Sequence, residues 1–365
     1  MGFSCGIVGL PNVGKSTLFN ALTRAGVPSS NYPFCTIDPN VGIVPVPDER
    51  LDVLAKLVDA KKVTPTTVRF VDIAGLVKGA SQGEGLGNQF LSHIREVDAI
   101  VQVVRLFEDK DVVHIGEVDP LRDLEIINME LIFKDLETIE NILAKRTKMA
   151  KAGNKEAQEE VALLEKVKSH IERGELIKNI SLEADEKKML DVYQFLTAKP
   201  LLIVANISEK EITTYEHNPL YKKLKEKADA LQADVLALSA KIEQELSELE
   251  PAEAKEYLKE LGLERSGLER LIVEGYKLLG LITFFTAGEK ETRAWTITRG
   301  TKAPQAAGVI HSDMEKGFIR AEVVSYEDFV KHGSWAALRD KGLIRLEGKD
   351  YVVQDGDVLI VRFSV

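Results

Sequence analysis

The sequence predicts an α/β protein with a helical insertion and a small β-rich domain towards its C-terminal end. Two observations predict the α/β part: apolar strands alternate with loops and helix-forming segments, and a glycine-rich loop follows the first strand. Such alternation is typical of a mostly parallel sheet that binds its ligand at the carboxyl ends of the strands. The third observation is a change of pattern, from helical spacing over residues 124–197 to short β-rich runs from residue 281 onward.

The first predicted element is a buried strand at residues 5–8, which is followed directly by Gly9-Leu10-Pro11-Asn12-Val13-Gly14-Lys15-Ser16. This string matches the GxxxxGK[ST] pattern of loops that cradle phosphates, and residues 16–22 favour a helix. Amides converge at the N-terminus of a helix, where the helix dipole also favours anions. A nucleoside triphosphate with Mg²⁺ is therefore the expected ligand, and its predicted contacts here are Asn12, Val13, Gly14, Lys15, Ser16 and Thr17.

Two further segments have the spacing of nucleotide-sensing switches. A strand at residues 68–71 ends in Asp72-Ile73-Ala74-Gly75, a DxxG sequence whose carboxylate reaches the Mg²⁺ shell and whose glycine amide can meet the γ-phosphate. Between the two motifs lies the irregular segment 31–40, in which Thr36 can offer its hydroxyl to Mg²⁺ or be an ordinary loop residue. The predicted metal ligands are therefore Ser16, Thr36 and Asp72.

The segment after the DxxG sequence bears on hydrolysis. It is rich in glycine, and we expect it to move with the nucleotide state. Ras-like enzymes place a glutamine directly after DxxG to orient the attacking water, whereas this chain has Leu76. Hydrolysis must then be slow or use another group, for which His114 is the candidate, although a structural histidine in a loop is the alternative. The predicted catalytic residues are Lys15, Gly75 and His114.

The base-binding loop departs from the NKxD sequence with which GTPases read guanine. The strand at residues 200–205 ends in Asn206-Ile207-Ser208-Glu209, so the lysine is absent and the carboxylate is one methylene longer. A misplaced hydrogen bond to a charged group costs roughly 1.5–3 kcal/mol, which makes adenine plausible and leaves guanine as the alternative. Another strand at residues 234–238 brings Ser239-Ala240-Lys241 to the same side. The predicted contacts of this loop pair are Asn206, Glu209, Ser239 and Ala240.

The insertion is predicted to form two antiparallel helices joined at Gly153-Asn154, because apolar residues recur three and four positions apart on both sides of that turn. Each helix would bury only one stripe, so we expect a projecting coiled coil. Residues 141–155 contain five basic residues and no acidic one, which fits contact with RNA phosphates or a solvated helix end. The five residues are Lys145, Arg146, Lys148, Lys151 and Lys155.

The C-terminal region predicts a small mixed domain with strands at residues 282–285, 294–298, 320–324 and 358–363 and a helix at residues 304–310. It shows no catalytic constellation. Its two tryptophans and His311 are expected to be core or surface residues, so the domain is interpreted as a binding module.

Composition and cysteine content exclude several classes of protein. The chain has 44% apolar and 29% charged residues, and no apolar run approaches the ~20 residues of a membrane span. The first strand begins too early for a signal peptide, so a cytoplasmic protein is expected. Cys5 and Cys35 cannot build a disulfide scaffold or a metal quartet. A net charge of −10 argues against a broadly basic nucleic-acid binder but permits a local basic patch.

Together these motifs closely resemble the YchF subfamily, the Obg-like ATPases among the translation-factor-related P-loop GTPases. The resemblance covers essentially the whole chain and is carried by residues 9–17, 31–40, 72–88 and 206–209. It implies a P-loop NTPase of the Ras-like G-domain type at residues 1–123 and 198–280. It also implies a coiled-coil insertion at residues 124–197 and a TGS domain, a ubiquitin-like β-grasp, at residues 281–365.

The resemblance further implies ATP in place of GTP, slow hydrolysis and binding to the ribosome. It suggests that Asn12 helps to hold K⁺, that His114 replaces the missing glutamine and that the backbone of Ile207 reads the base edge. The expected partners are ATP and the ribosome, with its large subunit and rRNA, for a monomer that binds no membrane. Two alternatives stay open: a GTPase of the same fold, and a scaffold that binds ATP without hydrolysing it.

Overall fold

The computed structural model describes residues 3–24, 40–73, 85–108 and 118–364, with only the backbone for residues 85–89. Two compact units make up the chain. The first comprises Phe3–Gly42 and Arg69–Leu271, and the second comprises Ile43–Val68 and Ile272–Val365. Each unit has its own sheet and its own buried core.

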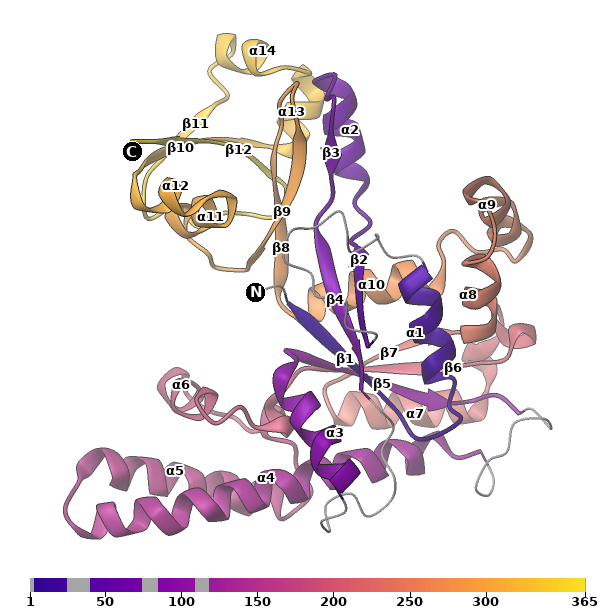
Figure 1. The fold of residues 1–365 in the computed structure, drawn as a ribbon, viewed down its shortest axis with the longest axis vertical. Coiled ribbons are helices and arrows are strands. Elements are labelled where there is room, and N and C mark those ends of the chain that lie inside the picture. Colours follow the sequence, from indigo (N-terminus) through magenta and orange to yellow (C-terminus); the bar gives the residue numbers. More distant parts are fainter. Residues whose placement is uncertain (1–2, 25–39, 74–84, 109–117, 365) are drawn as a thin grey trace. The chain divides into compact units, whose positions relative to one another are not determined.

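The first unit is built on a six-stranded sheet with the strand order β2-β4-β1-β5-β6-β7 (Figure 1). From β4 to β7 every neighbouring pair is parallel, which confirms the predicted mostly parallel α/β fold. Strands β1, β5 and β6 are buried along their whole length, as expected of central strands covered on both faces. The strands are β1 (Ser4–Val8), β2 (Val41–Pro45), β4 (Thr67–Asp72), β5 (Ala99–Arg105), β6 (Leu201–Asn206) and β7 (Asp234–Leu238). The unit boundaries fall within two of them, after Gly42 in β2 and before Arg69 in β4.

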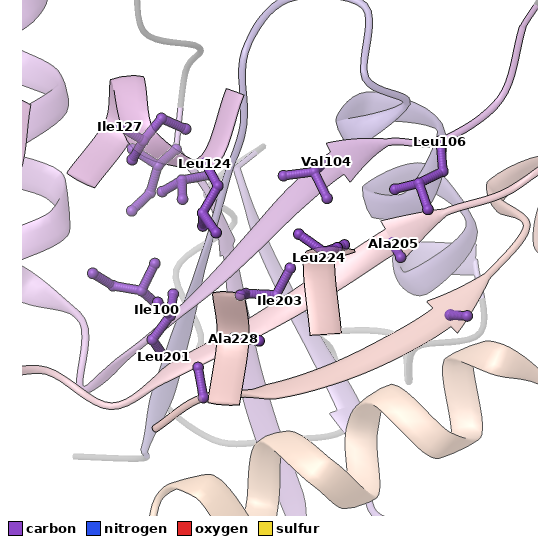
Figure 2. Packing of buried hydrophobic residues seen from close by; sticks show 14 of the residues in the cluster. Ile100, Val104, Leu106, Leu124, Ile127, Leu201, Ile203, Ala205, Leu224 and Ala228 are labelled. Atoms are coloured by element: carbon purple, nitrogen blue, oxygen red, sulfur yellow. The ribbon is translucent and has the colours of Figure 1, made fainter. Parts of the chain in front are cut away.

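Helices cover this sheet and bury its apolar side chains. Figure 2 shows buried side chains of this core: Leu124 and Ile127 come from α4 and Leu224 from α7, and they share one cluster with Ile203 of β6. Each fully buried leucine or isoleucine contributes about 1.5–3 kcal/mol, so this layer is a main source of stability. The helices of this unit, apart from its insertion, are α1 (Lys15–Arg24), α3 (Gly85–Glu96), the first part of α4 (Pro120–Lys151), α7 (Pro219–Ala230), α8 (Ala240–Leu246), α9 (Pro251–Glu260) and the start of α10 (Gly267–Leu278), which continues into the second unit after Leu271.

The helical insertion forms an arm (residues 132–195) with a core of its own. Helix α4 extends into the arm and ends at Lys151. The chain then turns at Gly153, whose φ is 92°, and α5 (Lys155–Ile171) runs back beside α4 (Figure 1). The side chain of Asn154 accepts a hydrogen bond from Ala157 N at 2.9 Å and so caps α5. The predicted pair of antiparallel helices joined at this turn is confirmed.

The root of the arm is fastened by a buried carboxylate. Asp135 of α4 accepts hydrogen bonds from Leu196 N at 2.9 Å and from Thr197 N at 2.8 Å, and its burial raises its pKa. Since α4 also belongs to the main core through Leu131, one continuous helix joins the arm to the rest of the first unit. The other short elements of this unit are α6 (Ala184–Asp191) and 3₁₀ turns at Ile177–Asn179, Leu196–Ala198, Glu209–Glu211 and Tyr215–His217.

The second unit has a mixed sheet with the order β11-β10-β12-β8-β9-β3, in which β12 and β8 are parallel. Its four longest strands match the four predicted runs, and a helix, α11, lies at the predicted position. The strands are β3 (Val63–Thr64), β8 (Leu281–Thr286), β9 (Thr292–Thr298), β10 (Phe318–Ser325), β11 (Arg345–Glu347) and β12 (Asp357–Phe363). The helices are α2 (Glu49–Leu57), α11 (Ala303–Ile310), α12 (Ser312–Lys316), α13 (Tyr326–His332) and α14 (Trp335–Asp340).

Residues 43–68 group with this second unit, although the sequence assigned them to the nucleotide-binding domain. The reason is burial: Leu51 and Leu54 of α2 belong to the same apolar cluster as Phe285 of β8. Arg50 adds an ion pair with Asp355, at 2.8 Å. These partners lie more than 200 positions away, so local pattern cannot reveal them.

The aromatic residues of the second unit have structural contacts. Trp295 donates to Thr286 Oγ1 at 3.0 Å, and Trp335 donates to Ala287 O at 3.0 Å. His311 Nδ1 accepts from Asp313 N at 3.2 Å and thereby caps α12. Each of the three residues therefore has a structural contact of its own.

Candidate nucleotide site

Five strands of the first sheet end at the same edge, and the candidate site lies there (Figure 1). Parallel order forces this arrangement, because all carboxyl ends of such strands point one way. The loops after β1, β4, β5, β6 and β7 begin at Gly9, Ile73, Leu106, Ile207 and Ser239.

The phosphate loop (residues 9–17) has the backbone of a tight anion-binding turn. Asn12 has φ 65° and Gly14 has φ 92°, both in the left-handed region. A Cβ atom added to Gly14 would lie 2.1 Å from Asn206 Nδ2, so a side chain is excluded there by contact as well as by conformation. Helix α1 starts at Lys15, and the free amides of its first turn are available to an anion.

Lys15 and Asp72 meet beside this loop. Lys15 Nζ donates to Asp72 Oδ1 across the gap between α1 and the end of β4, with 10% and 18% of the two side chains exposed. The structure therefore brings the predicted phosphate-binding cation and the predicted metal-binding carboxylate to one point. Ser16, the next residue of α1, is exposed.

A cavity of about 250 Å³ continues from the phosphate loop along the strand ends. Seven predicted site residues line it: Gly14, Thr17, Asn206, Ile207, Glu209, Ser239 and Ala240. We call this cavity the base pocket. Of the other predicted residues in the phosphate loop, Asn12, Val13, Lys15 and Ser16 are not part of its lining.

The base pocket also includes residues that were not predicted as site residues: Phe107, Glu108, Ser208, Lys241 and Gln244. Phe107 and Glu108 are the second and third residues after the end of β5. The rule that ligands bind at the carboxyl ends of parallel strands could have found them, since the sequence shows a strand ending just before. Gln244 is on the second turn of α8 and has no sequence signal of its own.

Asn206 connects the two ends of the site. Its Nδ2 donates to Val13 O in the phosphate loop, and its Oδ1 accepts from Ala240 N at the start of α8, both at 2.9 Å. Only 4% of the residue is exposed. Asn206 therefore positions two loops, in addition to lining the pocket.

The backbone of Ile207 has one group already engaged. Its N–H donates to Leu238 O at 2.9 Å, and its side chain is buried in the main core. If the backbone of Ile207 reads a base edge, it must do so through its carbonyl oxygen, which accepts hydrogen bonds.

The carboxylate that replaces the aspartate of NKxD is paired. Glu209 Oε1 contacts Lys241 Nζ, and this hydrogen bond is the main reason that the pKa of Glu209 is lowered. The two residues follow different strands, β6 and β7. An ion pair thus lies at the base pocket, and the positions of its two residues in the sequence did not predict it.

An aromatic ring forms another wall of the pocket. Phe107 is half-buried, and the guanidinium of Arg105 lies 4.4 Å from its ring centroid. Arg105 Nε also donates to Phe107 O at 2.9 Å. Arg105 therefore holds the ring of Phe107 in place.

Several predicted residues lie outside the described part of the chain. These are Thr36, Gly75, Leu76 and His114. Within the described residues, no group of three or more His, Cys, Asp or Glu side chains is arranged to hold a metal ion. A search of the described helices finds none with the length and apolar character of a membrane span.

The basic residues at the arm tip do not all behave alike. Arg146 Nε forms an ion pair with the buried Glu160 at 2.8 Å, so its charge is compensated. Among the described residues, no acidic side chain lies within ion-pair distance of the four lysines, Lys145, Lys148, Lys151 and Lys155. The exposed positive charge of the tip thus comes from lysine.

Comparison with known proteins identifies the family. Residues 4–145 match the family described as "50S ribosome-binding GTPase", and residues 281–364 match YchF-GTPase_C, described as "Protein of unknown function (DUF933)". The chain is 54% and 52% identical to the proteins named Ribosome-binding ATPase YchF of Bacillus subtilis and Escherichia coli O157:H7, over 100% of all three chains. The "Structure of the Schizosaccharomyces pombe YchF GTPase" is 42% identical, covers 99% of this chain and 98% of its own, and has a TM-score of 0.90. This chain therefore belongs to the YchF family.

Proposed function

We propose that this protein is a cytoplasmic ribosome-binding ATPase, which hydrolyses ATP to ADP and phosphate and engages the ribosome according to its nucleotide state. The observation that carries the proposal is the continuity of the phosphate loop with the base pocket, which share Gly14 and Thr17. A triphosphate on the loop and a purine in the pocket would then be parts of one ligand. The names of the bacterial relatives support the same activity and partner.

The polar groups of the base pocket favour adenine. Guanine needs donors for its O6 and an acceptor for its N1–H and N2–H₂ groups. Ala240 N–H already donates to Asn206, and the Glu209 carboxylate is paired with Lys241. Adenine needs an acceptor for its 6-amino group, which the carbonyl of Ile207 could supply. GTP is the second candidate, because the fission yeast relative is titled a GTPase.

Mg²⁺ fits the donor set beside the phosphate loop. A hydroxyl on Ser16 and a carboxylate on Asp72 are oxygen ligands of the kind that Mg²⁺ takes alongside substrate phosphates, and Thr36 would add a second hydroxyl. Ser16, Asp72 and Thr36 would hold the ion, which would supply positive charge to neutralise the negative charge that develops during phosphoryl transfer. Lys15 would contact the β- and γ-phosphates in exchange for its present contact with Asp72.

The residues expected to act on water and on the transferred phosphate are predictions from the sequence. Gly75 would donate its amide to the γ-phosphate, and His114 would orient the attacking water in place of the glutamine that Leu76 replaces. Slow intrinsic turnover follows from this substitution. Asn12 is proposed to help hold K⁺, so potassium should raise the rate relative to sodium.

Nucleotide binding provides the direct test of the proposed substrate. The full chain is titrated with ATP and with GTP in buffer containing Mg²⁺, and phosphate release is followed in single turnover for wild type and His114→Ala. Binding of ATP at least tenfold tighter than GTP, with release slowed in the variant, is expected. A tenfold preference for GTP would overturn the choice of ATP, and binding without any phosphate release would support the scaffold alternative.

For the ribosome we propose contacts from the arm and from the second unit. The lysines of the arm tip would meet rRNA phosphates of the large subunit, since local charge governs such contacts even in an acidic protein. The mixed sheet of the second unit, with apolar residues of α11 in its core, supports a TGS-type β-grasp assignment for residues 281–365 and a role in binding RNA or protein.

Charge reversal at the tip tests the arm. Lys148→Glu/Lys151→Glu should weaken co-sedimentation with ribosomes and reduce its salt dependence, because each lost phosphate contact lowers the salt slope by about 1. The matched control is Lys222→Glu/Lys225→Glu on α7, which keeps the same change of net charge at another surface. Equal effects of the two pairs, or none from either, would remove the arm from the interface.

A further inference from the structure

An ion pair between described residues of the base pocket joins two loops that both belong to the pocket. Glu209 follows β6, Lys241 follows β7, and Lys241 Nζ contacts Glu209 Oε1. The side chain of Glu209 is 39% exposed and that of Lys241 is 67% exposed, so the pair lies at the mouth of the cavity. Both residues line that cavity, together with Ser208 between β6 and Glu209.

A purine would meet this pair at its hydrogen-bonding edge, because the phosphate loop fixes the other end of the nucleotide. A carboxylate that recognises guanine must turn its oxygens toward the N1–H and N2–H₂ donors. An ammonium group that holds one of these oxygens competes directly with those donors. Adenine has no donor at N1 and no 2-amino group, so it loses nothing when the carboxylate is occupied.

The neighbouring groups increase this asymmetry. Ala240 N–H, at the start of the same helix as Lys241, donates to Asn206 Oδ1 at 2.9 Å and is engaged before any base arrives. A guanine O6 would compete with Asn206 for this donor.

We propose that Lys241 is a specificity-determining residue: by holding the Glu209 carboxylate in an ion pair, it prevents that group from accepting hydrogen bonds from guanine. Both the altered loop 206–209 and the side chain of Lys241, which follows a different strand, therefore contribute to discrimination against GTP. This inference rests on the proposed function, in which a nucleotide binds in the base pocket.

The pair can be broken without unfolding the protein. Exposed ion pairs contribute little to stability, and Lys241 is two-thirds exposed. Methionine retains most of the apolar stem of the lysine and removes its charge. A regained hydrogen bond to a charged group corresponds to about tenfold in affinity, which sets the expected size of the effect.

The experiment compares Kd for ATP and for GTP, both with Mg²⁺, in the full chain and three variants. Lys241→Met should shift the GTP-to-ATP affinity ratio toward GTP by about tenfold. Lys210→Met, which removes an exposed lysine next to Glu209 in the chain, should change the ratio by less than about twofold. The double variant Lys241→Met/Glu209→Gln should return to the wild-type ratio, because the carboxylate that gains guanine contacts is gone.

The outcomes separate this inference from the proposed function. Wild type that prefers ATP, with an unchanged ratio in Lys241→Met, would overturn the role of Lys241 and leave the ATPase proposal standing. A gain for GTP that persists in the double variant would also overturn it, since the gain would not depend on Glu209. Wild type that binds neither nucleotide would overturn the proposed function, and this inference with it.

Discussion

The two ends of the candidate site are built in different ways. The phosphate end is a single stretch of nine residues, the phosphate loop, whose shape depends on its own backbone and on the first turn of α1. The base end is assembled from the loops after β5, β6 and β7, which are about 30 to 100 residues apart in the chain. A function that needs closely spaced amides can be encoded locally, whereas recognition of a flat base from several sides requires several strands.

The ion pair at the phosphate end is more buried than the ion pair at the base end. Lys15 and Asp72 are mostly buried, whereas Glu209 is half-buried and Lys241 is exposed. Charges interact more strongly where water is excluded, so the phosphate end should supply most of the affinity. The base end should supply mainly the choice between purines.

The largest expected effect comes from the phosphate end. Lys15→Ala removes the cation proposed to contact the β- and γ-phosphates, and nucleotide affinity should fall about 100-fold. ATP, GTP and inorganic tripolyphosphate should all lose affinity to a similar degree, which isothermal titration can measure. Arg24→Ala, at the exposed far end of the same helix, is the control and should have no effect. Loss for ATP alone would contradict the division of the site into two ends.

The next effect concerns the residue that joins the ends. Asn206→Ala leaves Val13 O and Ala240 N without their buried partner, which should lower the free energy of unfolding by about 2 kcal/mol. Affinities for ATP and tripolyphosphate should both fall, because the phosphate loop loses its support. Urea unfolding and titration provide the measurements, and Lys210→Ala, at an exposed position four residues away, is the control. Wild-type stability in the variant would mean that Asn206 only lines the pocket.

A smaller effect is expected at the base end. Phe107→Ala removes an aromatic wall, and a ring that stacks on a base is worth about 1–3 kcal/mol, so ATP affinity should fall about tenfold. Tripolyphosphate affinity should not change, since it lacks a base. Phe107→Tyr keeps the ring and should bind ATP as wild type does. An equal loss for tripolyphosphate would show that the ring supports the phosphate loop.

The smallest effect is a change of titration at the base end. Lys241 lowers the pKa of Glu209, so the pair is formed above pH 4.5 and is lost as the pH falls through the lowered pKa. In Lys241→Met the pKa should move back toward its ordinary value of 4.5, as measured by NMR of the Glu209 carboxyl carbon. Stability should change little between pH 5 and pH 8, because the pair is exposed. An unchanged pKa in the variant would mean that the two groups do not interact in solution.

Prediction from sequence succeeded where periodicity or a contiguous motif carried the information. The parallel sheet, the two arm helices and the turn at Gly153 follow from apolar spacing and turn chemistry. Helix α2 and strand β3 were placed in another domain, because their partners are Phe285 and β9, which lie far along the chain. At the arm tip, charge counting grouped Arg146 with the lysines, and only the fold showed that Glu160 pairs with it.

By itself the sequence determined the phosphate loop, the ends of the strands and the exchange of NKxD for residues 206–209, because these are local and use the chemistry of adjacent residues. Tertiary structure decided which groups remain free to meet a base. It engages the amides of Ile207 and Ala240, pairs Glu209 with Lys241 and adds Phe107. The physical reason is that hydrogen bonds and charges act over a few ångströms in space, and folding alone sets which distant residues come that close.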